Sequence, residues 1–425
     1  MELEPEAGRL LNRHLSIAEE WFPHDYIPYR LGRDFDKEPW TPDQPRLTGV
    51  AQTAFEIGLL TEDNLPSYHR LIHGMFGSGD GAWVNWVGRW TAEEGRHAIV
   101  LRDYLTVTRN IDPILLERGR MSQLQNGYDH PFPDTLHGLA YVAFQEEWFP
   151  HDYIPYRLGR DFDKEPWTPD QPRLTGVAQT AFEIGLLTED NLPSYHRLIH
   201  GMFGSGDGAW VNWVGRWTAE EGRHAIVLRD YLTVTRNIDP VLLERGRMSQ
   251  LQQGYDHPFP DTLHGLAYVA FQELATRIAH RNTGRYSDDP VADRIMVRIA
   301  TDENLHMVFY RDMLKAAIQI EPSAAVRAIV DEVLAFQMPG AGIPNFLRKA
   351  ADVAKAGIYD LRAHRDEVLM PILRYWGIFE LSGLDAAAEE ARKRLHEHLE
   401  KLEASAKRFE ERLAASSVPR LGPAR

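Results

Sequence analysis

Residues 20–146 of this 425-residue chain occur a second time, almost letter for letter, as residues 147–273. The copies are offset by 127 positions, and they differ where Ile114 and Asn126 are replaced by Val241 and Gln253. Solenoid repeats are units of about 20–50 residues that diverge from one another, so this chain is not a solenoid. A very recent duplication and an error of gene assembly would both leave such a repeat. In either case the two copies share one coarse pattern of local structure.

Apolar residues at helical spacing occur in both copies and in the tail, and no convincing alternating pattern of a strand is visible. Pro66 and Pro193 are expected to kink the first long helix of each copy. The segment before the helix at Asp134 is expected to be a loop with short turns. The fold class is therefore predicted to be all-α, with helices at residues 1–19, 47–75, 82–108, from 134, 174–202, 209–235, from 261, 290–320, 323–337, 346–355, 365–376 and 384–414.

Composition excludes several classes of protein. The net charge of −15 argues against a general nucleic-acid binder, which would carry a basic surface. No run of about 18 uncharged apolar residues is present, so a transmembrane span is not expected. The acidic N-terminus has no apolar signal core, which predicts a cytoplasmic protein. Because the chain has 0 cysteines, disulfides, iron–sulfur clusters and thiolate zinc sites are excluded, whereas a metal held by oxygen and nitrogen is not.

Carboxylates and imidazoles recur on four successive predicted helices of the second copy and the tail. Residues three apart on a helix share one face, so each Glu-x-x-His pair aims at one point. The order Glu, Glu-x-x-His, Glu, Glu-x-x-His is that of ferritin-like di-iron carboxylate bundles. Four carboxylates can neutralise two iron ions, and the two imidazoles cap one iron each, with positions left for dioxygen. The predicted ligands are Glu189, Glu221, His224, Glu273, Glu303 and His306.

A single Glu-x-x-His motif is a weak signal, because a solvated acidic helix face has the same pattern. Two such motifs, each preceded about 30 residues upstream by a helical glutamate in an apolar setting, are much harder to explain that way. Glu273 follows the apolar stretch from Tyr268 to Phe271, and a lone buried carboxylate is costly unless it is paired or binds a metal. The pattern therefore predicts a metal site.

Residues near the predicted ligands allow two interpretations each. Asp302 could hydrogen-bond a ligating imidazole or face solvent. Arg223 could neutralise a site carboxylate or form an ordinary surface pair. Thr276 could face an oxygen pocket or bond back to its own helix. Glu220 and Asp190 flank the ligands, and we assign them surface or supporting roles. The tryptophans are expected to belong to the core, namely Trp210, Trp213 and Trp217.

Four motifs carry a resemblance to a known family. They are Trp-Thr-Ala-Glu-Glu-Gly-Arg-His at 217–224, Thr-Glu-Asp-Asn-Leu-Pro-Ser-Tyr at 188–195, Phe-Gln-Glu-Leu-Ala-Thr-Arg-Ile-Ala-His-Arg-Asn-Thr-Gly at 271–284, and Asp-Glu-Asn-Leu-His at 302–306. Together they are similar to the soluble acyl-[acyl-carrier-protein] desaturases, most of all the actinobacterial branch. The similarity covers residues 1–146 and, separately, 147–425.

The resemblance implies an oxygen-dependent desaturase of fatty acid biosynthesis. Such enzymes are homodimeric ferritin-like bundles with one di-iron centre per subunit. They remove two hydrogens from a saturated acyl chain on acyl carrier protein, with dioxygen as co-substrate and electrons from ferredoxin. The six predicted ligands match the family's iron ligands, and Thr276 matches its threonine near the oxygen site. A metal cofactor is needed because no side-chain base can break such a C–H bond.

The chain departs from the family in having two copies of its first half. The first copy offers half a site, from Glu62, Glu94, His97 and Glu146, but no second Glu-x-x-His follows it. The tail could close on either copy, and loop closure favours the second. We therefore predict an incomplete domain at 1–146 and a complete desaturase domain at 147–425. Because the usual protein partners are acidic, a basic patch is also expected, with Arg277, Arg281 and Arg285 as candidates.

Three other functions remain open on the sequence alone. The chain could be an inactive duplicated relic, an iron-storage or oxidase protein of the ferritin type, or a radical-bearing subunit similar to that of ribonucleotide reductase, with Tyr195 as the radical. Iron content separates the first two from a desaturase, because one closed site holds about two irons per chain, a relic holds almost none and a storage protein loads many.

Overall fold

The computed structural model describes residues 4–47, 49–76, 81–126, 148–174, 176–203, 208–257, 259–340, 343–414 and 421. All regular secondary structure among these residues is helical, which confirms the all-α prediction. A bilayer-spanning helix is absent from the described part of the chain. The chain divides into two compact units: the first holds Met1–Leu174, Glu183–Asp256 and Gly342–Pro344, and the second holds Thr175–Phe182, His257–Ala341 and Asn345–Arg425.

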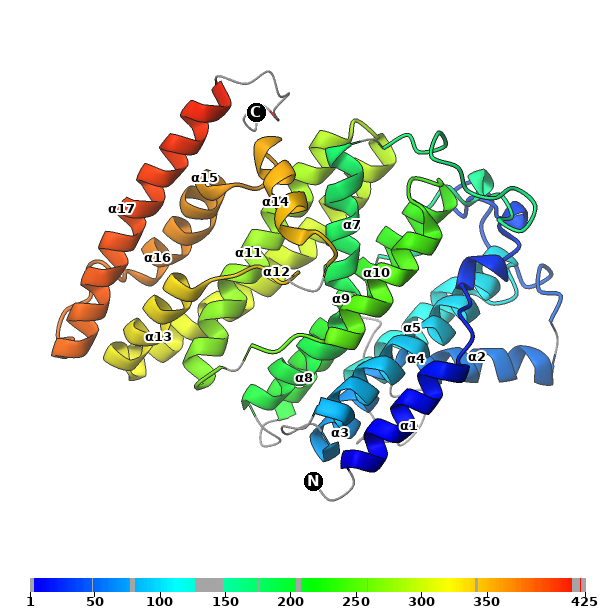
Figure 1. Cartoon of the computed structure of the whole chain (residues 1–425), viewed down its shortest axis with the longest axis horizontal. Coiled ribbons are helices and arrows are strands. Elements are labelled where there is room, and N and C mark those ends of the chain that lie inside the picture. Colours follow the sequence, from blue (N-terminus) through cyan, green and yellow to red (C-terminus); the bar gives the residue numbers. More distant parts are fainter. Residues whose placement is uncertain are drawn as a thin grey trace. The chain divides into compact units, whose positions relative to one another are not determined.

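The first unit contains helices from both copies of the repeat (Figure 1). Helix α1, which precedes the first copy, packs against the long helix α4, as do α2 and α3 of that copy, and in the second copy α8 packs against α9. Helices of the two copies also pack on each other, in the pairs α3 with α8, α5 with α9 and α10 with α4. The bounds are α1 Glu4–Ile17, α2 Val50–Asp63, α3 Leu65–Phe76, α4 Gly81–Val107, α5 Pro113–Asn126, α7 Val177–Glu189, α8 Leu192–Phe203, α9 Gly208–Val234 and α10 Pro240–Gln253.

The kink predicted at Pro66 and Pro193 is a complete break between two helices. In the first copy α2 ends at Asp63, Asn64 follows it, and Pro66 is the second residue of α3. Proline is tolerated in the first helical turn, where its missing N–H would have no partner within the helix. The second copy repeats this arrangement between α7 and α8, so the residues before each proline mark the end of a helix.

The loop predicted before Asp134 is wrong over residues 113–126, which form α5, and the equivalent segment of the second copy forms α10. The Asp239 carboxylate caps α10 by accepting from the backbone N–H groups of Val241 and Leu242, and Pro240 is its first residue. An apolar stripe is missing because buried positions are also polar, as with Glu117 and Arg120. The helix predicted from Asp134 lies largely outside the described residues.

The second unit is built on α11 Thr262–Ser287 and α12 Pro290–Ile320, which pack along each other. Asp261 caps the start of α11, and Asp288, in the left-handed conformation, follows its end. Asp289 then caps α12, with Pro290 in the first helical position. Gly284 permits close packing, because a Cβ there would lie 2.8 Å from the Cβ of Met296. This pair of helices carries the second group of predicted ligands.

The rest of the second unit confirms the predicted tail helices. Helix α13 packs against α11 and α17, and buried Trp376 donates from its indole N–H to the carbonyl of Arg311 at 2.8 Å. The first residues of α7 belong to this unit as well, where Ala181 packs with Ala356 and Ile358. The bounds are α13 Pro322–Ala335, α14 Phe346–Lys355, α15 Leu361–Ala363, a π-helical turn His364–Leu369, α16 Met370–Trp376 and α17 Ala386–Ala414.

The two compact units are cut differently from the two predicted domains. Both copies contribute to the first unit, whereas the prediction joined the whole second copy to the tail. The segments 1–146 and 147–425 therefore remain a prediction about which residues make one complete enzyme domain.

Candidate metal centre

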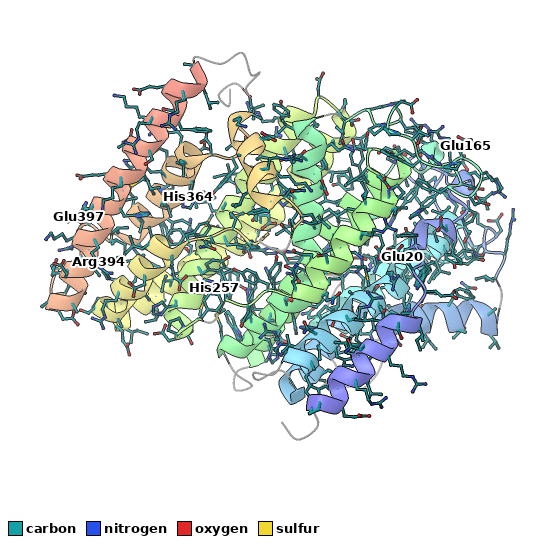
Figure 2. The ribbon with its side chains drawn as sticks, viewed as in Figure 1. Glu20, Glu165, His257, His364, Arg394 and Glu397 are labelled. Atoms are coloured by element: carbon teal, nitrogen blue, oxygen red, sulfur yellow. The ribbon has the colours of Figure 1, made fainter. Side chains whose placement is uncertain are left out.

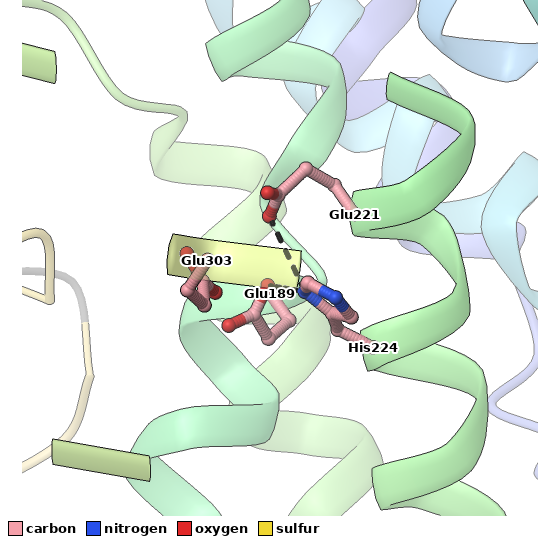
Figure 3. Close-up of side chains that lie close together, drawn as sticks. All are labelled: Glu189, Glu221, His224 and Glu303. Carbon is pink, nitrogen blue, oxygen red and sulfur yellow. Dashed lines mark ion pairs between the residues drawn. The ribbon is translucent and has the colours of Figure 1, made fainter. Parts of the chain in front are cut away.

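The first unit holds three of the predicted ligands in one buried group. Glu189 is the last residue of α7, and Glu221 and His224 stand one turn apart on α9. The His224 Nδ1 lies 3.6 Å from Oε2 of Glu189 and 3.7 Å from Oε2 of Glu221. Figure 3 shows both carboxylates pointing toward the imidazole. The His224 side chain has no solvent exposure, and both glutamates are buried. We call these residues the second-copy triad.

Trp148 packs against the histidine of the second-copy triad, and Arg223 packs against Trp148. The Trp148 ring lies nearly parallel to the His224 imidazole, with 6.5 Å between ring centroids. Arg223 lies over the same tryptophan at 5.2 Å and donates to its carbonyl oxygen at 2.8 Å. It also forms ion pairs with Glu220, at 3.7 Å, and with Glu117, at 3.8 Å. Arg223 thus orders the Trp148 backbone, and these two ion pairs are with residues outside the triad.

The second unit holds the other three predicted ligands in a similar group. Glu273 lies on α11, and Glu303 and His306 stand one turn apart on α12. The His306 Nδ1 lies 3.5 Å from Oε2 of Glu273, and all three side chains are almost fully buried. Both α12 residues lie on the buried stripe of that helix, which includes Ile299 and Met307. We call Glu273, Glu303 and His306 the tail triad.

Thr276 makes a direct contact with the tail triad. Its hydroxyl lies 2.9 Å from Oε2 of Glu303, to which it can donate, and 3.0 Å from the carbonyl oxygen of Glu273 on its own helix. Thr276 therefore bonds back to its own helix and also contacts a predicted ligand, and its place beside an oxygen pocket stays a prediction. His280, one turn further along α11, has its Nε2 3.9 Å from Oε1 of Glu303. The sequence reading missed His280, although its spacing from Glu273 and Thr276 places it on the same helix face.

The acidic residues beside the ligands have their own cationic partners. The Asp190 carboxylate pairs with Arg229, and Glu220 pairs with Arg216 at 2.6 Å. Asp302 is buried and pairs with Arg298, so it does not face solvent. Trp210 and Trp217 are buried, as predicted, and Trp213 is half-buried. Of the proposed basic patch, Arg281 is held by Asp293 at 2.6 Å, whereas Arg277 is exposed.

The chemistry of each triad fits a metal ion. Two ligands of one ion, each at about 2.0–2.2 Å, lie roughly 3–3.5 Å apart, which is close to the nitrogen–oxygen distances in both triads. Carboxylate oxygens together with neutral imidazole nitrogens suit iron, zinc and similar cations. Burying two carboxylates in one group is costly unless a cation accompanies them. Both triads are therefore buried Glu/His clusters compatible with a metal site.

The first copy forms the same group of residues in a more exposed setting. The His97 Nδ1 lies 2.9 Å from Oε2 of Glu94 and 3.7 Å from Oε2 of Glu62. Their side-chain exposures are 43% for His97, 26% for Glu94 and 28% for Glu62. Hydrogen bonds to Glu62 and Glu94 raise the pKa of His97 to about 9, so it is an imidazolium at neutral pH. We call this group the first-copy triad; Glu146, the fourth predicted ligand here, lies outside the described residues.

Comparison with known sequences points to one family. A family described as fatty acid desaturase matches residues 1–147 and again residues 146–420. A Mycobacterium tuberculosis protein provisionally named acyl-[acyl-carrier-protein] desaturase DesA1 is 47% identical over 281 residues, which cover 64% of this chain and 83% of that protein. A rice protein named acyl-[acyl-carrier-protein] desaturase 7, chloroplastic, is 31% identical over 272 residues, covering 58% of this chain and 67% of its own.

A second mycobacterial protein is also similar and has a solved structure. DesA2 of Mycobacterium tuberculosis, provisionally named an acyl-[acyl-carrier-protein] desaturase, is 33% identical over 237 residues, covering 55% of this chain and 86% of its own. Its X-ray structure aligns with 59% of this chain and 93% of that chain, at 29% identity and a TM-score of 0.47.

Proposed function

Because this chain belongs to the fatty acid desaturase family, we propose that it is an acyl-[acyl-carrier-protein] desaturase of fatty acid biosynthesis. It would introduce a double bond into a saturated acyl chain, in the way that the names of its relatives describe. The observation that carries the proposal is the coincidence of the family match with two buried Glu/His triads at the positions expected from sequence.

The proposed cofactor is a pair of iron ions in a ferritin-like helical bundle. Each triad supplies two carboxylates and one imidazole, which is the donor set of half a di-iron centre. When bound, the iron pair would supply the oxygen activation that breaks an unactivated C–H bond, with dioxygen as co-substrate. The proposed ligands are Glu189, Glu221, His224, Glu273, Glu303 and His306.

Residues around the tail triad would hold the ligands in place. The Thr276 hydroxyl can orient the Glu303 carboxylate by donating to it, which fixes which oxygen is available to a metal. His280 lies beside the other oxygen of the same carboxylate. Burial of these groups keeps bulk water away from the proposed reaction site, where low dielectric strengthens every interaction with a bound cation.

The proposed partners are acyl carrier protein as the bearer of the substrate and a ferredoxin-type electron donor. Both would require a local cationic contact on this acidic chain, and Arg277 is an exposed candidate on α11. The cytoplasmic location predicted from the N-terminus is part of this proposal. The resemblance implies a homodimer for a chain with one copy, whereas in this chain helices of the two copies pack on each other within one polypeptide.

A reconstituted reaction tests the proposal. Iron-loaded full chain, saturated acyl-[acyl-carrier-protein], reduced ferredoxin and oxygen should yield an acyl product lighter by two hydrogens in mass spectrometry. The Glu221→Gln variant should lose this product, and its matched control, Glu94→Gln in the first copy, should retain it.

Other outcomes would favour the alternatives. Many irons per chain without any desaturated product would favour a ferritin-like iron-binding protein, and an absence of iron would favour an inactive relic. A tyrosyl radical signal would favour the radical subunit; Tyr195 is half-buried, and loss of solvent around its phenol raises the pKa of that group well above the usual range.

A further inference from the structure

The two copies of the repeat contact each other within the first unit, and several contacts between described residues occur twice with the roles exchanged. A residue in the first copy touches a residue in the second, and their equivalents, 127 positions away, touch in return. We call this surface the copy interface. Its reciprocal pairs are Arg30–Asp161 with Arg157–Asp34, Arg96–Glu244 with Arg223–Glu117, Arg120–Ala219 with Arg247–Ala92, and His24–Phe162 with His151–Phe35.

The geometry of the reciprocal pairs agrees closely. The Arg120 guanidinium donates to the carbonyl of Ala219 at 2.8 Å, and Arg247 donates to the carbonyl of Ala92 at 2.8 Å. The ring pairs involving His24 and His151 both have centroids 4.9 Å apart. This agreement is what a local two-fold axis produces when two identical surfaces meet.

Buried carboxylates lock the entry segments of the two copies together. Asp161 accepts from the backbone N–H of Arg30 at 2.9 Å and pairs with its guanidinium. Asp34 does the same for Arg157, again at 2.9 Å from the backbone N–H. Both aspartates are about 5% exposed, whereas each arginine side chain is 53% exposed, so a buried carboxylate of one copy anchors a partly solvated guanidinium of the other.

Helices of opposite copies approach so closely that only glycine fits. A Cβ at Gly88 on α4 would collide with the carbonyl oxygen of Gln252 on α10, and a Cβ at Gly215 on α9 would collide with that of Gln125 on α5. These glycines have ordinary helical backbones, so the requirement comes from the neighbouring copy. Each copy of the repeat therefore carries a self-complementary surface, which packs against the same surface of the other copy.

Asp103 and Asp230 mark the axis itself. They are equivalent residues of the two copies, both are buried, and each accepts a hydrogen bond from a tyrosine of its own copy, Tyr29 at 2.9 Å and Tyr156 at 2.7 Å. They also interact with each other, and a residue meets its own equivalent in this way only on a two-fold axis. Burial, followed by the charge of Asp230, raises the pKa of Asp103 to about 7.

We propose that the first copy serves as an internal partner subunit: it occupies, within the same chain, the self-complementary face that a one-copy chain would offer to a second molecule. A two-fold interface is closed once two identical faces have met. The chain is therefore a monomer of 48.7 kDa in solution, and it carries two first halves around one complete set of ligands. In this role the first copy need not bind a metal.

Site-specific cross-linking tests whether the pairing is within one chain. Glu20, which follows α1 (Figure 2), and Arg245 of the second copy form an exposed contact across the copy interface, at 2.7 Å. The chain has 0 cysteines, so Glu20→Cys with Arg245→Cys creates one unique thiol in each copy. A short bismaleimide should join them within one chain. Single-cysteine variants are the controls, and they should show no cross-link.

Mixed isotopes and mass measurement complete the test. Equal amounts of 14N- and 15N-labelled double variant are mixed before cross-linking, and linked peptides of uniform isotope are expected. Sedimentation of the unmodified chain should give a single species near 48.7 kDa over a hundredfold range of concentration. Linked peptides of mixed isotope, or a species of twice that mass at micromolar concentration, would overturn the proposal. Neither measurement depends on desaturase activity.

Discussion

The first-copy and second-copy triads have the same residues in nearly the same sequence, yet the structure treats them differently. His97 is almost half exposed and sits 2.9 Å from Glu94, whereas His224 is fully buried with its two carboxylates at 3.6 and 3.7 Å. The first triad is closed by its own ion pair. In the second-copy triad the nitrogen–oxygen distances are longer and the group is buried. A cation bound between these three side chains would fit such an arrangement.

The helices that carry these triads show where the difference begins. On α2 of the first copy, Val50 is 86% exposed, whereas its equivalent Val177 on α7 packs against the buried cluster of Ala181, Ala356 and Ile358 in the second unit. In the sequence, the first copy is followed by the second copy of the repeat and not by the unique tail. A Glu-x-x-His motif is thus only a candidate ligand set, and the segment that comes after it in the chain decides its environment.

Exchanging the ligand histidine should produce the largest contrast between the copies. His224→Gln removes an imidazole from the proposed centre, and we expect iron binding and desaturation to fall by at least about 100-fold. Replacing a residue that only hydrogen-bonds to a metal ligand already lowers metal affinity or activity by about 10–100-fold. His97→Gln should leave activity within about twofold. Iron per chain and product yield measure both; equal losses in the two variants would contradict the assignment.

Core truncation should distinguish the two copies of the first long helix. Phe182 on α7 is fully buried, so Phe182→Ala should lower the free energy of unfolding by about 3–5 kcal/mol. Phe55, its equivalent on α2, is half-buried beside Tyr104, and Phe55→Ala should cost about 1 kcal/mol. Urea unfolding followed by circular dichroism gives both values. A larger loss for Phe55→Ala would show that α2 is covered in solution.

The copy interface should make stability depend on pH. The pKa of Asp103 is raised in the folded chain to about 7, so the fold binds more protons than the unfolded chain between about pH 4 and pH 7. Stability should therefore fall as pH rises through that window, by about 2–4 kcal/mol. Asp103→Asn should weaken this slope and stabilise the chain at pH 8. Glu400 is exposed on α17, so Glu400→Gln is the control and should leave the slope unchanged.

The first-copy triad should give the smallest effect. The pKa of His97 is raised to about 9 by its bonds to Glu62 and Glu94, so its contribution to stability is complete below about pH 6.5 and is lost as pH rises through 9. Because this imidazole is almost half exposed, the contribution should be about 0.5 kcal/mol. Comparing the unfolding of His97→Gln with the parent chain at pH 6 and pH 10 checks it; an equal difference at both values would be the contrary result.

Most of the helices could be predicted because the apolar residues of each buried face and the capping residues lie within or beside the helix in the sequence. The buried stripe of α12 includes Glu303 and His306, and Asp289 with Pro290 marks its start. Helices α5 and α10 were not predicted because their buried faces carry charged residues such as Arg120, which pairs with Glu117 on its own helix and donates to the carbonyl of Ala219 on α9. A hydrophobic pattern has no signal for a face that is buried by ion pairs.

The ligand set could also be predicted from its spacing, but the residues that hydrogen-bond to the ligands were harder to predict. Thr276 was a candidate by position, and its contact with Glu303 joins residues 27 positions apart on different helices. The copy interface left almost no trace in the sequence. Arg30 and Asp34 are four residues apart and suggest a local pair, whereas each in fact pairs with the opposite copy. The sequence of one copy contains no pattern that predicts its packing against the other copy.

Asp103 and Asp230 also bear on how such a chain can change over time. In an assembly of two separate identical molecules, a side chain on the axis always faces an unaltered duplicate of itself, and any replacement there happens twice. Here the two positions are encoded independently, so one can become arginine while the other stays acidic. Joining the halves into one polypeptide thus opens asymmetric solutions at the centre of the pairing that a symmetric pair can never reach.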